Sequence, residues 1–217
     1  MAQTFLRLVV LLSLILVPAF ADTIATWDFS NFGNNVDLGA SMVFAPSSGG
    51  SSPTITATAF NGGDLFYKNT GSGEAGLGLT GDPTGQNEIF HLDATGAAAS
   101  DFIQLDVSAL IAAGFTNTTF FMMNSTGGDA WQENACAVSG SLCSNATHTG
   151  GNDDGTKISV TLDAGHPFLD FEATSGNVLV AEFGATQPTT VPEPATLVLL
   201  GSALLAVSIR GRRYMTR

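Results

Sequence analysis

Short runs of apolar, β-branched and aromatic residues alternate with polar turn formers along most of the chain. No segment of the central region keeps the 3.6-residue period of an amphipathic helix. In KISVTL the alternation places Ile158, Val160 and Leu162 on one face of an extended strand, whereas TTFFMM (118–123) has no alternation and predicts a strand buried on both faces. Strands are predicted at residues 23–29, 40–45, 54–60, 64–69, 87–94, 102–108, 117–124, 157–163, 168–174 and 177–183.

Turn-forming residues gather between these runs, as in SSGGSSP, TGDPTG and TGGNDDG. Many short strands separated by such loops are typical of an antiparallel β-sandwich or a jelly roll. SALIAAGF, at 108–115, predicts one helical turn between strands. The pattern divides the chain into a leader at 1–21, one all-β domain at 22–184, an exposed linker at 185–190 and a C-terminal segment at 191–217.

Residues 1–21 have the three parts of a secretory signal peptide. Arg7 precedes an apolar run at 8–17, and the small residues Ala19 and Ala21 form an A-x-A cleavage site. The run is too short for a membrane anchor, since a spanning helix needs about 20 residues. We therefore expect export, with cleavage before Asp22.

The acidic residues are concentrated in the central region. Of the 19 Asp and Glu residues only Glu193 lies outside 22–190, whereas only Lys68 and Lys157 of the 7 Lys and Arg residues lie inside it. Because proteins bind a phosphate backbone through Lys and Arg, this balance excludes nucleic acid as a partner. It is compatible with divalent cations, or with simple solubility outside the cell.

Cys136 and Cys143 enclose a turn-forming Ser-Gly-Ser in CAVSGSLC. In an exported protein such a close pair predicts a disulfide that clips a hairpin tip or a tight loop. Loop-closure entropy gives about 2.5 kcal/mol for so short a loop. The disulfide is favoured over a metal or redox role because the spacing is not CxxC and there is no second pair.

The chain ends with VPEP, an apolar stretch and a cluster of arginines. The uncharged residues 195–209 would form a helix about 22 Å long, which is short for a hydrocarbon core of about 30 Å. Arg210, Arg212 and Arg213 then stop the segment and are expected to stay cytoplasmic, with the domain on the far side of the membrane. These features predict an exported domain tethered by a marginal C-terminal helix.

The order of Val191-Pro192-Glu193-Pro194, an apolar run and an arginine cluster closely resembles the PEP-CTERM sorting signal. Proteins with this signal are typical of Gram-negative bacteria that make extracellular polysaccharide. The resemblance implies processing by an exosortase, a membrane transpeptidase that cleaves near the Pro-Glu-Pro. The C-terminal helix then needs to hold the protein at the inner membrane only until it is processed, and the expected destination is the cell surface or the extracellular matrix.

The central region has a second resemblance. GEAGLGLTGDPTGQNEIF, at 73–90, is similar to a glycine-rich stretch of many PEP-CTERM proteins in which a GLGV-like run precedes an acidic EI segment. This resemblance implies a β-sandwich, and most such domains have no assigned activity. The present chain departs from the pattern in NEIFHLDA and in its cysteine loop.

No catalytic motif is found in the sequence. His91, His148 and His166 each fall in a different predicted element, and HExxH, GxSxG and P-loop patterns are absent. We expect no enzymatic activity and assign no catalytic residue.

Two loops and one tryptophan are the candidate ligand sites. Asp82 and Glu88 in GDPTGQNE, and Asp153 and Asp154 in GGNDDG, offer oxygen ligands for Ca²⁺, although turn formation alone accounts for such residues. Trp131 is predicted to lie in a loop among polar residues, where it has the chemistry of a sugar platform; packing on the nearby disulfide is the alternative.

The sequence thus predicts an exported, non-catalytic surface or matrix protein that is structural or adhesive in the exopolysaccharide matrix. Its expected partners are an exosortase and, transiently, the inner membrane. A carbohydrate- or calcium-binding lectin-like module is the alternative, with extracellular polysaccharide as a ligand. An extracellular hydrolase is a third hypothesis, and it would require two carboxylates facing a cleft.

Overall fold

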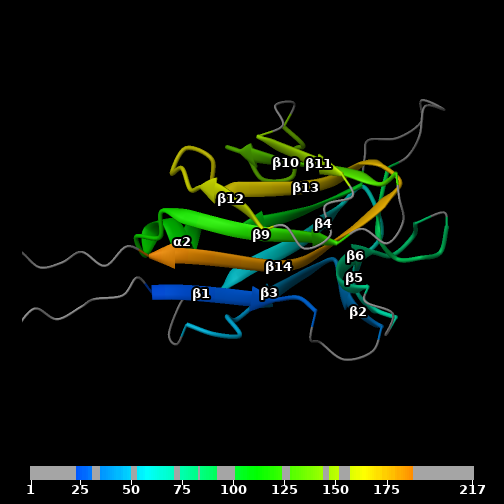
Figure 1. Cartoon of the computed structure of the whole chain (residues 1–217), viewed down its shortest axis with the longest axis horizontal. Helices are drawn as coiled ribbons and strands as arrows, with labels where there is room; N and C mark the ends of the chain where they lie inside the picture. Colours follow the sequence, from blue (N-terminus) through cyan, green and yellow to red (C-terminus); the bar gives the residue numbers. More distant parts are fainter. Residues whose placement is uncertain are drawn as a thin grey trace, which may run out of the picture. The chain divides into compact units, whose positions relative to one another are not determined.

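The described residues form two antiparallel β-sheets and little helix, as the apolar pattern predicts (Figure 1). The computed structural model describes residues 23–30, 35–49, 53–70, 74–82, 84–91, 101–123, 128–143, 147–151 and 157–187. These residues belong to a unit that spans Thr23–Pro188. The one described helix, α2 (Ser108–Ala112), buries Leu110 and confirms the helical turn predicted after the strand at 102–108.

The larger sheet is built around β14. Along one edge β14 pairs with β9, and along the other it pairs with β1 and β6, while β7 pairs with its first two residues. Its near-continuous apolar run suits this central position, because most of its residues are buried. The order is β12 (Ile158–Thr161), β9 (Asn117–Met123), β14 (Asn177–Gln187), β6 (Ala75–Leu79), β5 (Leu65–Asn69) and β2 (Val36–Gly39), with β1 (Thr23–Asp28) and β7 (Ile89–Phe90) also on β14.

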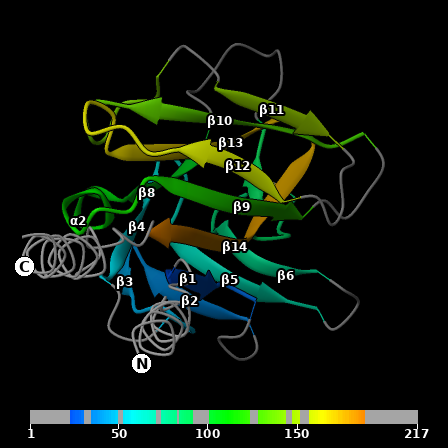
Figure 2. The ribbon, with the colours of Figure 1, turned by 60° about the vertical axis from the view of Figure 1, so that its left-hand side comes forward.

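The smaller sheet has six strands among the described residues, and Figure 2 shows β11, β10 and β13 side by side at one end of it. Its order is β11 (His148–Gly151), β10 (Ala130–Cys136), β13 (Phe168–Ser175), β8 (Phe102–Asp106), β4 (Ile55–Phe60) and β3 (Ser41–Phe44). The two faces of β13 differ in chemistry: Leu169 and Phe171 belong to the hydrophobic core, whereas Asp170 and Glu172 alternate with them and lie on the outer face.

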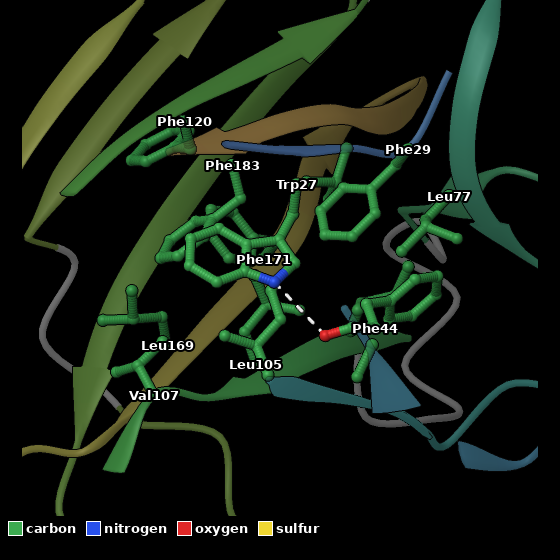
Figure 3. Packing of buried hydrophobic residues seen from close by; sticks show 14 of the residues in the cluster. Trp27, Phe29, Phe44, Leu77, Leu105, Val107, Phe120, Leu169, Phe171 and Phe183 are labelled. Carbon is green, nitrogen blue, oxygen red and sulfur yellow. Dashed lines mark hydrogen bonds between the residues drawn. The ribbon is translucent and has the colours of Figure 1, made fainter. Parts of the chain in front are cut away.

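Aromatic rings from both sheets fill the space between them (Figure 3). Trp27 of β1 lies 5.8 Å from Phe183 of β14 between ring centroids, and its indole N–H donates a hydrogen bond of 3.2 Å to the carbonyl oxygen of Phe44 in the other sheet. Phe120 of β9 packs edge-on against Phe171 of β13, with centroids 4.9 Å apart. Each fully buried ring contributes about 1.5–3 kcal/mol, so these contacts hold the sheets together.

The strand prediction for 118–123 is correct in position and wrong in burial. Phe120 and Met122 are buried, whereas Phe121 and Met123 are only partly buried on the opposite face. The run is apolar on both faces, but only one face of β9 meets the hydrophobic core. The strand predicted at 87–94 is confirmed at β7 alone, and residues 92–94 lie outside the described residues.

The predicted linker at 185–190 begins too early. β14 continues to Gln187, which pairs with Thr23, and Ala185 is buried in register with Ala25 of β1. Backbone pairing thus keeps residues 185–187 in the sheet, with β1 along the whole segment and with β9 as far as Thr186. Residues 188–190, with the proline and threonines that suggested a linker, lie outside the described part of the chain.

Four strands are missing from the sequence prediction, namely β2, β6, β10 and β11. β6 has the sequence AGLGL and β10 the sequence AWQENAC, and both are rich in residues with low strand propensity. Pairing with neighbours on both edges overrides that propensity, since β6 lies between β14 and β5, and β10 between β11 and β13.

Candidate functional sites

The predicted sorting and processing segments lie outside the described part of the chain. This applies to Val191, Pro192, Glu193, Pro194, Arg210, Arg212, Arg213, Ala19 and Ala21, and also to the candidate calcium ligands Asp153 and Asp154. Among the residues that the structure describes, no helix has the length and apolar character needed to cross a membrane.

Trp131 does not form the exposed platform that the sequence suggested. It lies in β10, is 2% exposed, and packs edge-on against Phe120 with ring centroids 5.3 Å apart. The neighbouring strand accommodates the indole because position 150 is glycine: a Cβ there would lie 2.5 Å from the ring. The loop prediction was wrong because the polar residues around Trp131 do not show the pattern of a strand. The buried indole has no face free to stack on a sugar.

Close packing against a neighbouring segment explains why position 78, in the stretch at 73–90, is glycine. Gly78 in β6 faces the chain that returns toward β7, and a Cβ at this position would lie only 2.2 Å from the carbonyl oxygen of Asn87. Any larger residue would push that segment away from the sheet. The close approach brings Glu88 against Lys68 of β5, and Ile89 then enters the hydrophobic core.

Lys68 and Glu88 form a buried ion pair. The Lys68 ammonium also contacts Glu74 at 2.9 Å. Burial lowers the pKa of Lys68, but the hydrogen bonds and charges of the two glutamates outweigh this effect and raise it overall. Burial raises the pKa of Glu88 against the opposing effect of Lys68. Glu88 Oε2 has no hydrogen-bond partner among the described residues, so burying this pair of charges costs free energy. The contact between the two charges offsets that cost.

A hollow of about 380 Å³ opens beside this ion pair. Phe66 gives it an aromatic side, while Gln86 and Asn87 contribute amide groups from the segment that crosses β6. Its full lining consists of Asn35, Phe66, Lys68, Thr70, Gly85, Gln86 and Asn87. Sequence reasoning missed this site, although Lys68 is one of only two cations in the acidic central region.

Asp82 and Glu88, which the sequence suggests as calcium ligands, have separate partners in the structure. The Asp82 carboxylate accepts hydrogen bonds from the Thr84 hydroxyl and backbone N–H and from the Gln86 N–H, so it stabilises its own turn. Glu88 is occupied by Lys68.

A different acidic residue lies near Asp82. Asp101 is 4% exposed, and burial raises its pKa, with a further rise from the negative charge of Asp82. Within the described part of the chain, the Asp101 carboxyl has no hydrogen bond or ion pair of its own.

The outer face of the six-stranded sheet carries a polar layer, defined here as Gln104, Gln132, Asn134, Asp170 and Glu172, of which all but Gln132 are buried. Cross-strand register places Gln104 opposite Asp170 and Asp170 opposite Asn134. The loop after β10 covers the layer, because Ser139 Oγ and the Gly140 N–H both donate to Gln104 Oε1, at 2.7 and 3.2 Å. Cys136 and Cys143 close that loop as a disulfide, with Cα atoms 5.8 Å apart.

Asp170 is the most perturbed carboxyl of this layer. Burial raises its pKa to about 7, and the charge of Glu172 adds to the rise, while a hydrogen bond from Gln104 opposes it. Gln104 Nε2 lies 2.7 Å from Asp170 Oδ1, and Cys136 Sγ lies 2.9 Å from Oδ2. Glu172 Oε1 accepts from the side-chain amides of Asn134, at 3.0 Å, and Gln132. The sequence signal was present in FLDFEAT, where acids alternate with core residues.

The histidines have separate partners. His148 Nδ1 lies 2.9 Å from Glu133 Oε2, and burial raises the pKa of that glutamate. His166 lies 2.6 Å from Asp163 on the surface, and His91 Nδ1 lies 3.2 Å from a backbone oxygen. In the described ranges no hydrogen bond joins a histidine to a serine, threonine or cysteine side chain.

A family model, the PEP-CTERM protein-sorting motif, matches residues 190–213, which contain the VPEP sequence and the arginines after the apolar run. No curated protein matches the chain.

The buried ion pair leads to a stability prediction. Lys68→Met leaves Glu88 buried without its cation, and we expect the free energy of unfolding to fall by about 3–5 kcal/mol in urea titrations. Lys157→Met is the matched control, because Lys157 pairs with Glu182 on the surface and should cost no more than about 1 kcal/mol. The Lys68→Met/Glu88→Met double variant should be more stable than Lys68→Met alone. Equal effects of the two single lysine variants would contradict this account.

Proposed function

We propose that this PEP-CTERM protein is an exported, non-catalytic component of the cell surface or extracellular matrix, processed by an exosortase near its Pro-Glu-Pro. The motif match at residues 190–213 carries the proposal, because it coincides with VPEP, the apolar run and Arg210, Arg212 and Arg213. The signal-peptide pattern at 1–21 supports export from the other end of the chain.

The arrangement of the carboxyl groups supports a structural or adhesive role over hydrolysis. Asp170 and Glu172 lie on the same face of β13, but they are 0% and 2% exposed beneath the disulfide loop. Glycoside hydrolysis requires two carboxyl groups that flank a substrate in a cleft. Neither group has access to a polymer in this arrangement.

The hollow beside Lys68 is the best candidate for contact with extracellular polysaccharide. Its volume of about 380 Å³ is within the ordinary range for small-ligand sites. Phe66 offers a partly exposed aromatic ring, and the amides of Asn35, Gln86 and Asn87 offer both donors and acceptors. This combination suits neutral hydroxyl-rich sugars better than anionic ones, because Glu74 and Glu88 already neutralise Lys68.

Processing is tested by expressing the full chain in a host with its exosortase and in the same host without it. We expect the intact mass of the surface-associated protein to lose the residues after the Pro-Glu-Pro only when the enzyme is present. Pro192→Ala/Glu193→Ala should block that loss, whereas Thr189→Ala, just outside the motif, should not. An unchanged C-terminus in both hosts would reduce the segment to a membrane anchor.

Adhesion is tested by binding of the full chain to purified exopolysaccharide and to a neutral glycan array. Phe66→Ala should weaken binding at least tenfold, since stacking on an aromatic ring is lost. Phe121→Ala is the matched control, because Phe121 is also partly buried and lies in the same sheet, on β9. Binding that is absent, or equally reduced in both variants, would remove this hollow as the adhesive site.

Calcium binding is a second candidate function, and Asp101 is the observation that favours it. Asp101 is 4% exposed, and both burial and the negative charge of Asp82 disfavour its carboxylate form. A hard cation between the two would offset that repulsion, and backbone carbonyls and water could complete an oxygen shell. This pair differs from the sequence-based choice, since Asp101 takes the place of Glu88.

Thermal unfolding with and without millimolar Ca²⁺ tests this second function. At 10–100 times Kd, binding would add about 1.4–2.7 kcal/mol, which corresponds to a rise in Tm of roughly 3–10 °C. Asp101→Asn should abolish the rise, whereas Asp163→Asn, which alters an exposed aspartate, should retain it. No shift of the unmodified protein with Ca²⁺ would remove Asp101 as a calcium ligand.

A further inference from the structure

The Cys136–Cys143 disulfide lies directly on the buried carboxyl group of Asp170. Cys136 Sγ is 2.9 Å from Asp170 Oδ2, and both residues are fully buried. Cys143, in contrast, is partly exposed. An attacking group from solvent can therefore approach Cys143, while the sulfur that would leave is the one against Asp170.

The surroundings of Asp170 favour its neutral form. Gln104 from β8 and the Cys143 backbone N–H donate hydrogen bonds that favour the carboxylate, but burial and the negative charges of Glu172 and Glu133 outweigh them. The resulting pKa is about 7. No basic side chain contributes to the pKa of Asp170 among the described residues.

The contact between Asp170 and Cys136 Sγ also requires the neutral form of Asp170. A sulfur atom in a disulfide carries no hydrogen and can only accept a hydrogen bond. The 2.9 Å contact is therefore a hydrogen bond only when Asp170 holds the proton and donates it toward Cys136 Sγ. The oxidised protein thus keeps an acid in place beside one specific sulfur.

We propose that Cys136–Cys143 is a thiol–disulfide exchange site for a reducing dithiol, with Asp170 as the proton donor to Cys136. A thiolate of the dithiol attacks Cys143 Sγ, forms a mixed disulfide and breaks the bond to Cys136. The electron pair of that bond passes to Cys136 Sγ, which takes the Asp170 proton and becomes a thiol, leaving Asp170 as a carboxylate. The second thiol of the dithiol then attacks the mixed disulfide, so the dithiol is oxidised and Cys143 is released as a thiol.

The burial of Cys136 makes this proton necessary. A thiolate leaving into a fully buried position would be an unpaired charge beside two acidic residues, which raises the barrier to reduction. Transfer of the Asp170 proton removes that charge from sulfur and places it on a carboxylate already bonded by Gln104. Reduction then unties the loop that Ser139 and Gly140 hold over the polar layer.

The proposal predicts how the reduction potential changes with pH. Full reduction places one proton on each sulfur, and each proton drawn from solvent contributes about 30 mV per pH unit in a two-electron couple. In the reduced protein the Cys136 thiol donates a hydrogen bond to the Asp170 carboxylate, and the untied loop admits water, so the pKa of Asp170 falls toward the ordinary aspartate value of about 3.9. Between that value and about 7, Asp170 supplies one of the two protons. We therefore expect a slope of about 30 mV per pH unit in that window and about 59 mV above it.

The experiment equilibrates the full oxidised chain with dithiol redox buffers from pH 5 to 8 and counts alkylated cysteines by mass. Asp170→Asn should show about 59 mV per pH unit throughout, and its reduction at pH 6, per dithiol thiolate, should be at least tenfold slower. Glu172→Gln is the matched control: it should keep the change of slope, moved to lower pH because a charge that raises the pKa of Asp170 is gone.

The wild-type profile alone decides the matter if Asp170→Asn does not fold. A uniform slope of about 59 mV per pH unit across the whole range would overturn the proposal. So would equal reduction rates for Asp170→Asn and the wild type at pH 6.

Discussion

The pairing of β14 on both edges is the constraint on which the rest of the structure depends. β9 lies on one edge, and β1 and β6 lie on the other. This arrangement brings Trp27 and Phe120 to the inner face, where they meet the six-stranded sheet through Phe44 and Phe171. It also sets β6 beside β5, so that the segment crossing Gly78 can bring Glu88 to Lys68. The core and the ion pair therefore share one organising strand.

Sequence patterns predicted the parts of the fold that local chemistry determines. Alternation at 158–162 and the apolar run of β14 identified strands because burial alone decides those positions. β6 and β10 escaped because their strand conformation comes from neighbours on both edges. For the same reason Trp131 was taken for a loop residue, although an aromatic residue in a strand is the commoner case. Composition cannot reveal pairing between strands that are distant in the chain.

The candidate sites also differ in whether consecutive residues of the sequence could reveal them. The C-terminal motif was recognisable because its meaning lies in consecutive residues, and the family match covers that same segment. The hollow beside Lys68 was not, because Asn35, Phe66 and Gln86 come from three separate parts of the chain. Likewise, Asp82 was correctly seen as an acid in a turn, but its acidic neighbour Asp101 comes from much later in the sequence. Only the fold shows which residues that are distant in the sequence lie close together.

The polar layer raises the question of why a small protein would bury Asp170 and Glu172 on an outer face when apolar residues would cost less. An apolar outer face would cover the sheet equally well, but it would not hold the cysteine loop through specific hydrogen bonds to Gln104. Buried polar groups add little to the stability of the fold, but they strongly favour one arrangement of the chain over others. The reason is that each group needs a partner with the correct geometry. The layer thus defines one position for the loop. Since Asn134 Oδ1 lacks a partner among the described residues, even this layer is not fully satisfied, so its retention is better explained by what it does to the disulfide than by stability.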